Sequence, residues 1–418
     1  MRSNIVVIGG GIVGLCSALR LQQAGFAVTI IDDDIIRSAA SWGNAGHIAI
    51  EQVEPLASRA MIRSAPQRLF ARGGALSLPP SQVGRWLPFA ARMWQASSPP
   101  RFAAGRRALT ALLADAMPAW QRLVGDIGQP GLLRADGHYI VWESAATAAA
   151  GRAKWRAADT GTARFRDADA DEIEQLTRLT GRHPAGAIRF ENSGQITSPT
   201  ALDSGLERAF RAAGGIIRRG HARLNRNDRR VWPVLDDGTL IAADLVIVAA
   251  GVRSELMMES VDHPVPIIAE RGYHIQSPSH SWPPTMPPVV FEDRSMIVTA
   301  FAEGLRAASF VEFAGVDTPP DRRKWRRLEA HVAALGLPVD APFTQWIGAR
   351  PTLPDYLPAI GRSDRTSNLI YAFGHQHLGL TLAPVTAELV TALALAQRPR
   401  IDLTPFDIDR FKAKAHRS

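Results

Sequence analysis

A glycine-rich turn between two apolar runs constrains this chain more than any other feature. The run Ile5–Ile8 leads directly into Gly9–Gly14, with the sequence Gly-Gly-Gly-Ile-Val-Gly, and a second apolar run, Ala27–Ile31, ends at Asp32. This order predicts a strand, a tight turn, a helix and a second strand. Such a unit binds the adenosine half of a dinucleotide, with the phosphates at the N-terminus of the helix.

Each glycine of the turn has a separate physical task. Gly9 permits the tight turn, Gly11 lets the backbone approach a pyrophosphate because it has no Cβ, and Gly14 lets the helix pack close to the strand. A carboxylate at Asp32 accepts hydrogen bonds from ribose hydroxyls and disfavours a 2′-phosphate, which argues against NADP. The nucleotide-binding residues predicted in this unit are Gly9, Gly11, Ile12, Val13, Gly14, Asp32 and Asp33.

Length and composition set the broad class. A chain of 418 residues with 46% hydrophobic and 21% charged residues can form two domains with sizeable cores. The chain has no uninterrupted run of about 18 apolar residues, so we predict no membrane-spanning helix. Cys16 is the only cysteine, which excludes intrachain disulfides and a cysteine-ligated metal site and fits a reducing compartment. We therefore expect a cytoplasmic protein without a bound metal.

The net charge of +8 comes almost entirely from arginine. Its densest basic run, Arg322–Arg327, lies within a stretch with helical periodicity, Asp321–Leu335. We interpret the basic residues as the solvated face of that helix and expect no nucleic-acid partner. The apolar stripe on the other face consists of Trp325, Leu328, Val332 and Leu335.

An aromatic stretch, Trp86–Trp94, has two interpretations. As one edge of a helix it would belong to the core of a substrate domain, which we favour. As an exposed patch it would dock the chain peripherally on the inner face of the membrane and pass electrons to quinone.

The middle and end of the chain predict further strands of the same parallel sheet and, between them, a second domain. Ala243–Gly251 is a short apolar strand that ends in glycine, as expected at the buried centre of a parallel sheet. Near the C-terminus, the strand Leu369–Phe373 is followed by the turn Gly374–Leu380 and a helix, Ala383–Ala396. Antiparallel strands are predicted between these two regions, at Gly272–Gln276, Met296–Phe301 and Ala307–Phe313.

Five separate motifs occur in the order found in one family. They are the opening glycine turn, Ser41–His47, Arg271–Tyr273, Gly348–Arg350 and Gly374–Pro384. Together they resemble the D-amino-acid oxidase superfamily of FAD-dependent enzymes, most of all its bacterial D-amino-acid dehydrogenase branch of the small-subunit type. Glycine and sarcosine oxidases are similar but more distant. The resemblance covers nearly the whole chain.

The resemblance implies an α/β (α+β) fold with a Rossmann-like FAD-binding domain and an inserted substrate domain built on a mostly antiparallel sheet. We assign residues 1–85, 190–262 and 346–418 to the FAD-binding domain and residues 86–189 and 263–345 to the substrate domain. The implied reaction is hydride transfer from the α-carbon of a D-amino acid to flavin N5, giving an imino acid. A cyclic substrate such as D-proline or hydroxy-D-proline is our narrower prediction.

The resemblance also implies site residues. Arg350 matches the arginine that grips the substrate carboxylate, with a structural ion pair between domains as the alternative. Tyr273 would donate to the same carboxylate, or pack in the core with its hydroxyl satisfied. His47 and His377 would border the substrate, although a buried core histidine is an equal alternative for His375 and His377. We name no general base, because none is needed once the amine is neutral.

Two further segments are implied to contact the flavin. The loop before His47 would lie against the ring near N5, and the C-terminal turn would face its pyrimidine end, where the helix dipole stabilises negative charge. No cysteine follows Cys16, so we expect non-covalent FAD. The flavin-contacting residues predicted here are Ser41, Asn44, Ala45, Gly46, His47, Gly251, Gly374, His375, Leu378, Gly379, Leu380 and Thr381.

Several alternatives stay open at this point. The acceptor of the electrons is a quinone chain or oxygen, and an oxygen-using oxidase of glycine, sarcosine or another secondary amine is the nearest alternative enzyme. A nicotinamide dehydrogenase would leave the C-terminal motif without a task. A non-catalytic FAD-binding subunit of a larger dehydrogenase, and an oligomer of this chain, are further alternatives.

Overall fold

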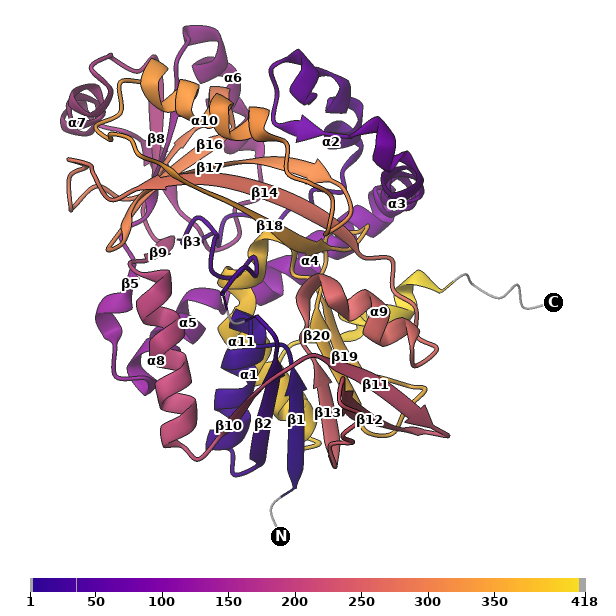
Figure 1. The fold of residues 1–418 in the computed structure, drawn as a ribbon. Coiled ribbons are helices and arrows are strands. Elements are labelled where there is room, and N and C mark those ends of the chain that lie inside the picture. The colour runs from indigo at the N-terminus through magenta and orange to yellow at the C-terminus, as the bar shows by residue number, and fades with distance from the viewer. Residues whose placement is uncertain (1–2, 35, 413–418) are drawn as a thin grey trace.

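Two large sheets placed end to end dominate the structure, a computed structural model that describes residues 3–34 and 36–412. In Figure 1 the smaller sheet lies at the bottom with the N-terminus, and the larger sheet lies above it. A third, three-stranded sheet pairs β3 (His47–Ile48) and β5 (Leu133–Arg134) with β9 (Gly194–Ile196).

The smaller sheet has the strand order β10-β2-β1-β13-β20-β19. All neighbours are parallel except β19, which runs antiparallel to β20. This order, with the first strand at the centre, is that of a dinucleotide-binding fold and confirms the predicted fold class. The strands are β1 (Asn4–Ile8), β2 (Ala27–Asp32), β10 (Ile216–Arg219), β13 (Leu245–Val248), β19 (Ala359–Arg362) and β20 (Leu369–Phe373).

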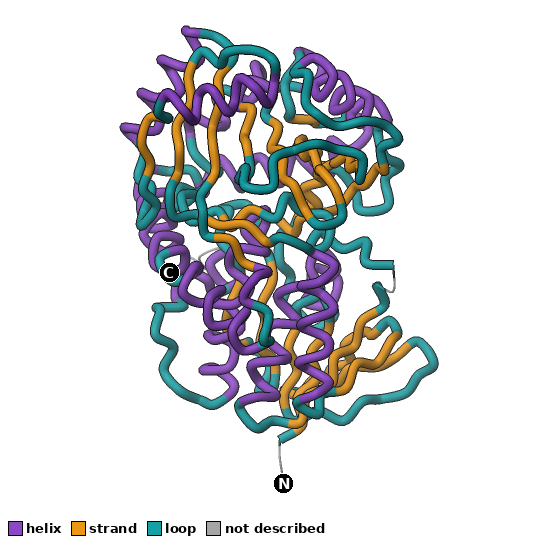
Figure 2. Tube along the Cα trace, turned by 90° about the vertical axis from the view of Figure 1, so that its left-hand side faces the viewer, coloured by secondary structure: helices purple, strands orange, loops and turns teal. Residues whose placement is uncertain are grey.

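Alternation along β1 decides what covers each face of this sheet. Ile5 and Val7 pack with the helices of one layer, whereas Val6 and Ile8 pack against a hairpin on the other face. Figure 2 shows the helices and the strands of this half as separate layers. The helices are α1 (Ile12–Gln23), α5 (Ala116–Asp126), α8 (Pro199–Ala212) and α11 (Gly379–Ala394), and the hairpin is β11 (Ala222–Asn227) with β12 (Arg230–Leu235).

The larger sheet has the order β18-β14-β17-β16-β15-β6-β8-β7, and β4 pairs with β17. Helix α10 (Arg322–Ala334) covers its outer face through Trp325, Leu328 and Val332. The strands are β4 (Leu76–Ser77), β6 (His138–Trp142), β7 (Phe165–Asp167), β8 (Gly186–Phe190), β14 (Ile268–Ser277), β15 (Val289–Phe291), β16 (Met296–Phe301), β17 (Gly304–Phe313) and β18 (Thr344–Thr352).

The remaining helices flank these layers, and four elements pack with the domain other than the one predicted for them. β4 and β18 belong to the larger sheet, whereas α4 and α5 pack against α11 of the smaller domain. The apolar faces of these elements pack against the surface that lies nearest in space, and the order of elements along the chain does not reveal which surface that is. These helices are α2 (Arg59–Arg63), α3 (Val83–Ala96), α4 (Pro99–Leu113), α6 (Ala145–Ala157), α7 (Ala170–Thr180) and α9 (Ser254–Glu259).

The structure corrects one local interpretation and bears in part on a second. The basic run predicts a solvated position for Lys324, but its side chain is fully buried and forms ion pairs with Glu312 of β17 and Asp321. A lysine beside the apolar stripe of α10 is buried because a carboxylate of the sheet faces it. The aromatic stretch forms α3, where Phe89 is buried, as the favoured interpretation has it, while Leu87 and Trp94 are 55% and 43% exposed; the membrane contact of this exposed face stays a prediction.

One stretch, Gln376–Ala394, is long and apolar enough to cross a membrane by length and composition. It includes α11, which packs against α1 and α5 in the interior of the smaller domain. That is the environment of a core helix, so the stretch gives only weak evidence for a membrane span.

Candidate active site

A single large cavity runs from the glycine turn after β1 to the inner face of the larger sheet. Its volume is about 2060 Å³, whereas a small-molecule pocket usually has about 300–1,000 Å³. The cavity therefore has room for a dinucleotide and a second ligand. Most of the predicted site residues line it. The exceptions are Gly14, Gly374, Leu378 and Thr381.

The nucleotide end of the cavity is made of backbone. Gly9 has φ +108°, and a Cβ on Gly14 would lie 1.9 Å from the carbonyl oxygen of Gly9. Helix α1 starts at Ile12 without a side-chain cap from its first flanking residue, Gly11, and the Ile12 amide donates to Ser41 Oγ at 3.0 Å. A bare helix N-terminus that opens into a cavity suits an anionic phosphate.

Asp32 lies at the rim of this end, but its two oxygens have protein partners. Oδ1 accepts from the Gly10 amide at 3.0 Å, and Oδ2 accepts from Arg219 at 3.1 Å, with Arg37 3.5 Å away. A ribose bound at Asp32 would therefore share these two oxygens with the Gly10 amide and Arg219. That role of Asp32 stays a prediction, and the same holds for Asp33, which pairs with Arg253.

The loop predicted to face the flavin ring is held from behind by the larger sheet. Gly46 has φ +69°, and its amide donates to Asn44 Oδ1 at 2.7 Å. The buried Arg306 of β17 donates to the Asn44 carbonyl, and His274 of β14 bonds the Gly43 carbonyl at 2.9 Å. The loop is therefore fixed before a ligand arrives. A glycine cradle, an open helix N-terminus and a pre-formed loop along one cavity fit FAD.

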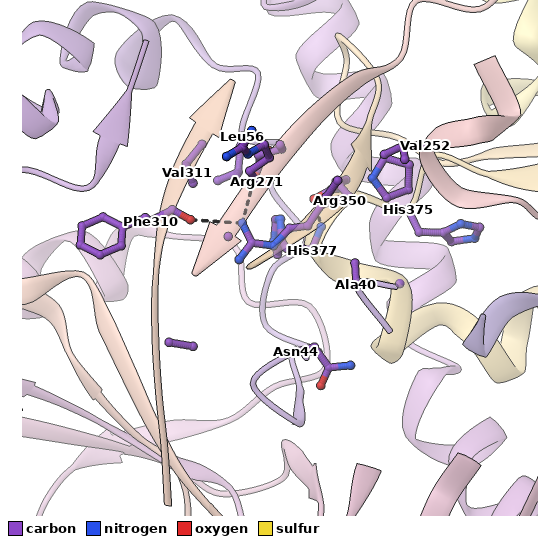
Figure 3. A pocket seen from close by; sticks show the side chains of 18 of the residues that line it. Ala40, Asn44, Leu56, Val252, Arg271, Phe310, Val311, Arg350, His375 and His377 are labelled. Atoms are coloured by element: carbon purple, nitrogen blue, oxygen red, sulfur yellow. Dashed lines mark hydrogen bonds and ion pairs between the residues drawn. The ribbon is translucent and has the colours of Figure 1, made fainter. Parts of the chain in front are cut away.

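Arg350 projects from β18 into the other end of the cavity (Figure 3). Its Nη1 donates to Glu270 Oε1 at 3.3 Å and to the Phe310 carbonyl at 3.3 Å. A Cβ on Gly272 would lie 2.2 Å from Nη2, so the guanidinium lies directly over this glycine and would have to move if a side chain were added. No described residue accepts a hydrogen bond from Nη2 or Nε, which leaves these donors for a carboxylate ligand.

Glu270 is the carboxylate that orients Arg350. It is 1% exposed, and its Oε2 accepts from Thr352 Oγ1 at 3.2 Å and from the Tyr356 hydroxyl at 3.1 Å. Because Glu270 stands directly opposite Arg350 in the β14–β18 ladder, both side chains lie on the same face of the sheet. A buried carboxylate with this many donors holds the guanidinium in one place.

Tyr273 belongs to the opposite face of the same strand. It pairs in register with Ile347, three residues from Arg350, so alternation turns it toward α10. Its hydroxyl donates to Glu312 at 2.9 Å and accepts from Arg271 and from the Asp321 amide. Although Tyr273 borders the cavity, its hydroxyl does not reach Arg350 and is satisfied within the core, which was the alternative interpretation.

His47 takes part in a cluster that the sequence did not reveal. Its Nε2 donates to Glu51 at 3.1 Å, and its ring meets the edge of His138 at 4.3 Å between centroids. Burial opposes ionisation of Glu51, but His47 and His138 outweigh it and lower the carboxyl pKa to about 2. Burial and the nearby His47 lower the pKa of His138 to about 3.

The two histidines of the C-terminal turn have different surroundings. His377 lies near Arg350 and bonds Gln52, and burial together with Arg350 lowers its pKa to about 3. His375 bonds Thr386 Oγ1 at 3.0 Å and is 2% exposed, as a satisfied core histidine is. Thr381 accepts from the Ala49 amide at 3.0 Å, so its hydroxyl serves the loop instead of a ligand.

Sequence reasoning missed the side chains that support these groups. A weak signal existed for Glu51, because it follows the predicted His47 by four residues. No local pattern marks the others, since each comes from a strand or turn that is distant in sequence. The missed residues are Glu51, Arg68, His138, Glu270, Arg306 and Tyr356.

A family model described as FAD dependent oxidoreductase (DAO) matches residues 4–393, which include both ends of the cavity. The chain belongs to this family. The match confirms the predicted family and its FAD cofactor, and the residues of the nucleotide end fit that cofactor as described above.

Two relatives are similar to the chain in sequence, and one solved structure is similar to it in fold. It is 31% identical to a D-amino-acid oxidase of Bradyrhizobium diazoefficiens, over 98% of this chain and 99% of that protein. It is 25% identical to a D-amino acid dehydrogenase of Chromohalobacter salexigens, over 98% of this chain and 100% of that protein. The structure of glycine oxidase from Geobacillus kaustophilus has a TM-score of 0.73 at 17% identity, covering 99% and 100% of the two chains.

Proposed function

We propose that this FAD-dependent oxidoreductase removes two electrons from the α-carbon of D-amino acids and releases an imino acid that water hydrolyses. One observation carries the proposal: Arg350 stands in the cavity with unused donors, fixed by the buried Glu270. The names of two relatives, a D-amino-acid oxidase and a D-amino acid dehydrogenase, support the D configuration.

In this proposal, bound FAD supplies the hydride acceptor. Arg350 binds the α-carboxylate through Nη2 and Nε, because Nη1 is already engaged by Glu270 and Phe310. His377 lies beside this group as a neutral imidazole at physiological pH, since its pKa is lowered to about 3 by burial and by Arg350. Because Arg350 is fixed on a rigid strand, the bound carboxylate would hold the α-hydrogen in one orientation toward the hydride acceptor. Positioning of this kind raises the rate of reaction.

The test is anaerobic mixing of the flavin-loaded protein with D- and L-forms of the same amino acids, monitored by flavin absorbance. We expect D-amino acids to bleach the flavin and their L-forms to leave it oxidised. Bleaching by L-forms alone would contradict the proposal. Bleaching by glycine or sarcosine alone would favour the alternative of a secondary-amine oxidase. D-Proline and hydroxy-D-proline belong in the panel, because a cyclic substrate is the narrower prediction.

For the electron acceptor, we propose a quinone pool reached by peripheral contact with the inner face of the membrane. Residues 55–114 contain nine arginines and no aspartate, glutamate or lysine. Within this segment α3 exposes Leu87 and Trp94. A basic, partly apolar helix face suits an anionic lipid surface.

Co-sedimentation with vesicles tests this contact. We expect binding to vesicles that contain phosphatidylglycerol, little binding to neutral vesicles, and loss of binding in Leu87→Ser/Trp94→Ser. Fast reoxidation of the reduced flavin by air, without vesicle binding, would instead support oxygen as the acceptor and a cytoplasmic enzyme.

A further inference from the structure

A second arginine, Arg68, lies in the cavity without a counter-ion. It ends the short turn Ala65–Arg68 and is half-buried. Its Nη2 donates to the Met61 carbonyl at 2.8 Å, but its Nε is buried without an acceptor among the described residues. Within residues 3–34 and 36–412, no carboxylate lies within 4.0 Å of its guanidinium.

Other buried or half-buried arginines that line the cavity are compensated. Arg350 pairs with Glu270, and Arg271 pairs with Glu312. Burial lowers the pKa of Arg68, and the charged form of Tyr356 opposes this effect. A cation withdrawn from water is costly unless an anion accompanies it, so this position favours an anionic ligand.

Arg68 lies at the same end of the cavity as Arg350. Tyr356 is buried and donates to Glu270, the partner of Arg350, and although burial raises its pKa, both guanidinium groups oppose that shift. Leu69, the next residue, forms a bridge with Leu76. Leu76 pairs with Val311, the neighbour of the residue whose carbonyl binds Arg350. One phenol therefore lies within electrostatic reach of two cations that come from different parts of the chain.

We propose that Arg68 binds a second carboxylate of the substrate, so that the preferred substrates are D-amino acids with an acidic side chain. This inference rests on the proposed function and narrows its substrate class. Arg350 takes the α-carboxylate, and Arg68 takes the side-chain carboxylate as a charge-assisted hydrogen-bonded pair. A substrate of the D-proline type has no group for Arg68, so the two predictions rank the same compounds differently.

D-Glutamate and D-glutamine form a matched pair, because their shapes are nearly the same but only D-glutamate has a charged side chain. In anaerobic flavin reduction we expect D-glutamate to saturate at a concentration about tenfold lower than D-glutamine, as one favourable ion pair would give. Arg68→Met should abolish this preference, because it weakens saturation by D-glutamate far more than saturation by D-glutamine. Arg72→Met is the control, since Arg72 also lines the cavity but is exposed.

Equal saturation by the two compounds in the unmodified protein would overturn the inference, and so would equal loss of both in Arg68→Met. If no D-amino acid reduces the flavin, the proposed function fails, and Arg68 is tested separately with non-reactive ligands. Glutarate should then perturb the flavin spectrum at a lower concentration than its monoamide, and Arg68→Met should remove that difference. No difference in the unmodified protein would contradict a second carboxylate site.

Discussion

The two ends of the cavity are built by different means. The nucleotide end uses glycines and a helix N-terminus within residues 9–14, and its contacts are mostly to backbone. The other end, which we call the substrate end because we propose that the substrate binds there, uses side chains from β14, β18 and separate turns, which meet only in the folded chain. The first end is specified locally in the sequence, whereas the second depends on the register between distant strands.

This difference decides what a substitution can do. At the nucleotide end an added side chain strikes backbone, which cannot move without unfolding the turn. At the substrate end an added side chain strikes the tip of a long arginine, which can move aside at the cost of its alignment. We therefore expect loss of cofactor in the first case and weaker substrate binding with retained cofactor in the second.

The largest effect is expected from Gly14→Val. Its Cβ would lie 1.9 Å from the Gly9 carbonyl oxygen, so the helix could not approach the strand. We expect the protein to purify without flavin colour or to fail to fold, as absorbance and circular dichroism would show. Gly125→Ala is the control, because a Cβ there has no atom within 4 Å. Normal flavin content in Gly14→Val would contradict the expected difference between the two ends of the cavity.

Gly272→Ala tests the substrate end. The new methyl group would lie 2.2 Å from Arg350 Nη2 and would displace the guanidinium without moving backbone. Misplacement by about 1 Å can cost roughly a hundredfold in rate, so kcat/KM should fall by about that factor while flavin content stays normal. Parallel loss of flavin would show that the two ends are not separable in this way.

Glu270→Gln removes the charge that fixes Arg350 but keeps the shape of the side chain. The amide that replaces the carboxylate would retain one acceptor oxygen for the donors that now surround it. We expect KM to rise about tenfold and the protein to lose about 1–3 kcal/mol of stability, because a buried hydrogen-bonding group is left unsatisfied. Tyr356→Phe should have a smaller effect on KM. An unchanged KM in Glu270→Gln would remove Glu270 from the account of binding.

The smallest and most distributed effect is on acid stability. Burial lowers the pKa of His138, His274, His375 and His377 to about 3, so the folded chain binds fewer protons than the unfolded chain between pH 6.5 and 3. The stability they contribute is present above pH 6.5 and is lost as the pH falls toward 3, by up to about 1.4 kcal/mol per pH unit for each.

Thermal unfolding at pH 7 and pH 5 measures this loss. We expect the Tm of the unmodified protein to fall markedly from pH 7 to pH 5. The fall should be smaller in His375→Gln, because this variant lacks one of the buried imidazoles. An equal fall in both proteins would show that His375 does not contribute to the pH dependence.

The sequence predicted the nucleotide end well because its physical requirements are local. The turn after β1, the helix from Ile12 and the strand ending at Asp32 each follow from a few neighbouring residues. It also predicted an apolar stripe along α10. It could not predict the burial of Lys324, because the partner Glu312 lies on another element.

The substrate end was predicted only through single motifs. Arg271–Tyr273 and Gly348–Arg350 were both recognised, but their pairing was not, and the register decides which side chains share a face. That register puts Glu270 beside Arg350 and turns Tyr273 away. The same limit concealed Arg68 and Glu51, whose importance lies in what surrounds them in the folded chain.

The central claim is that Arg350 binds a carboxylate at the substrate end of an FAD-containing cavity. The most direct measurement is titration of the flavin-loaded protein with a small non-reactive carboxylate such as butyrate, monitored by the flavin spectrum, in the unmodified protein and in Arg350→Met. We expect saturable binding that weakens at least about tenfold in the variant, with flavin content unchanged. Equal affinity in the two proteins would contradict the claim.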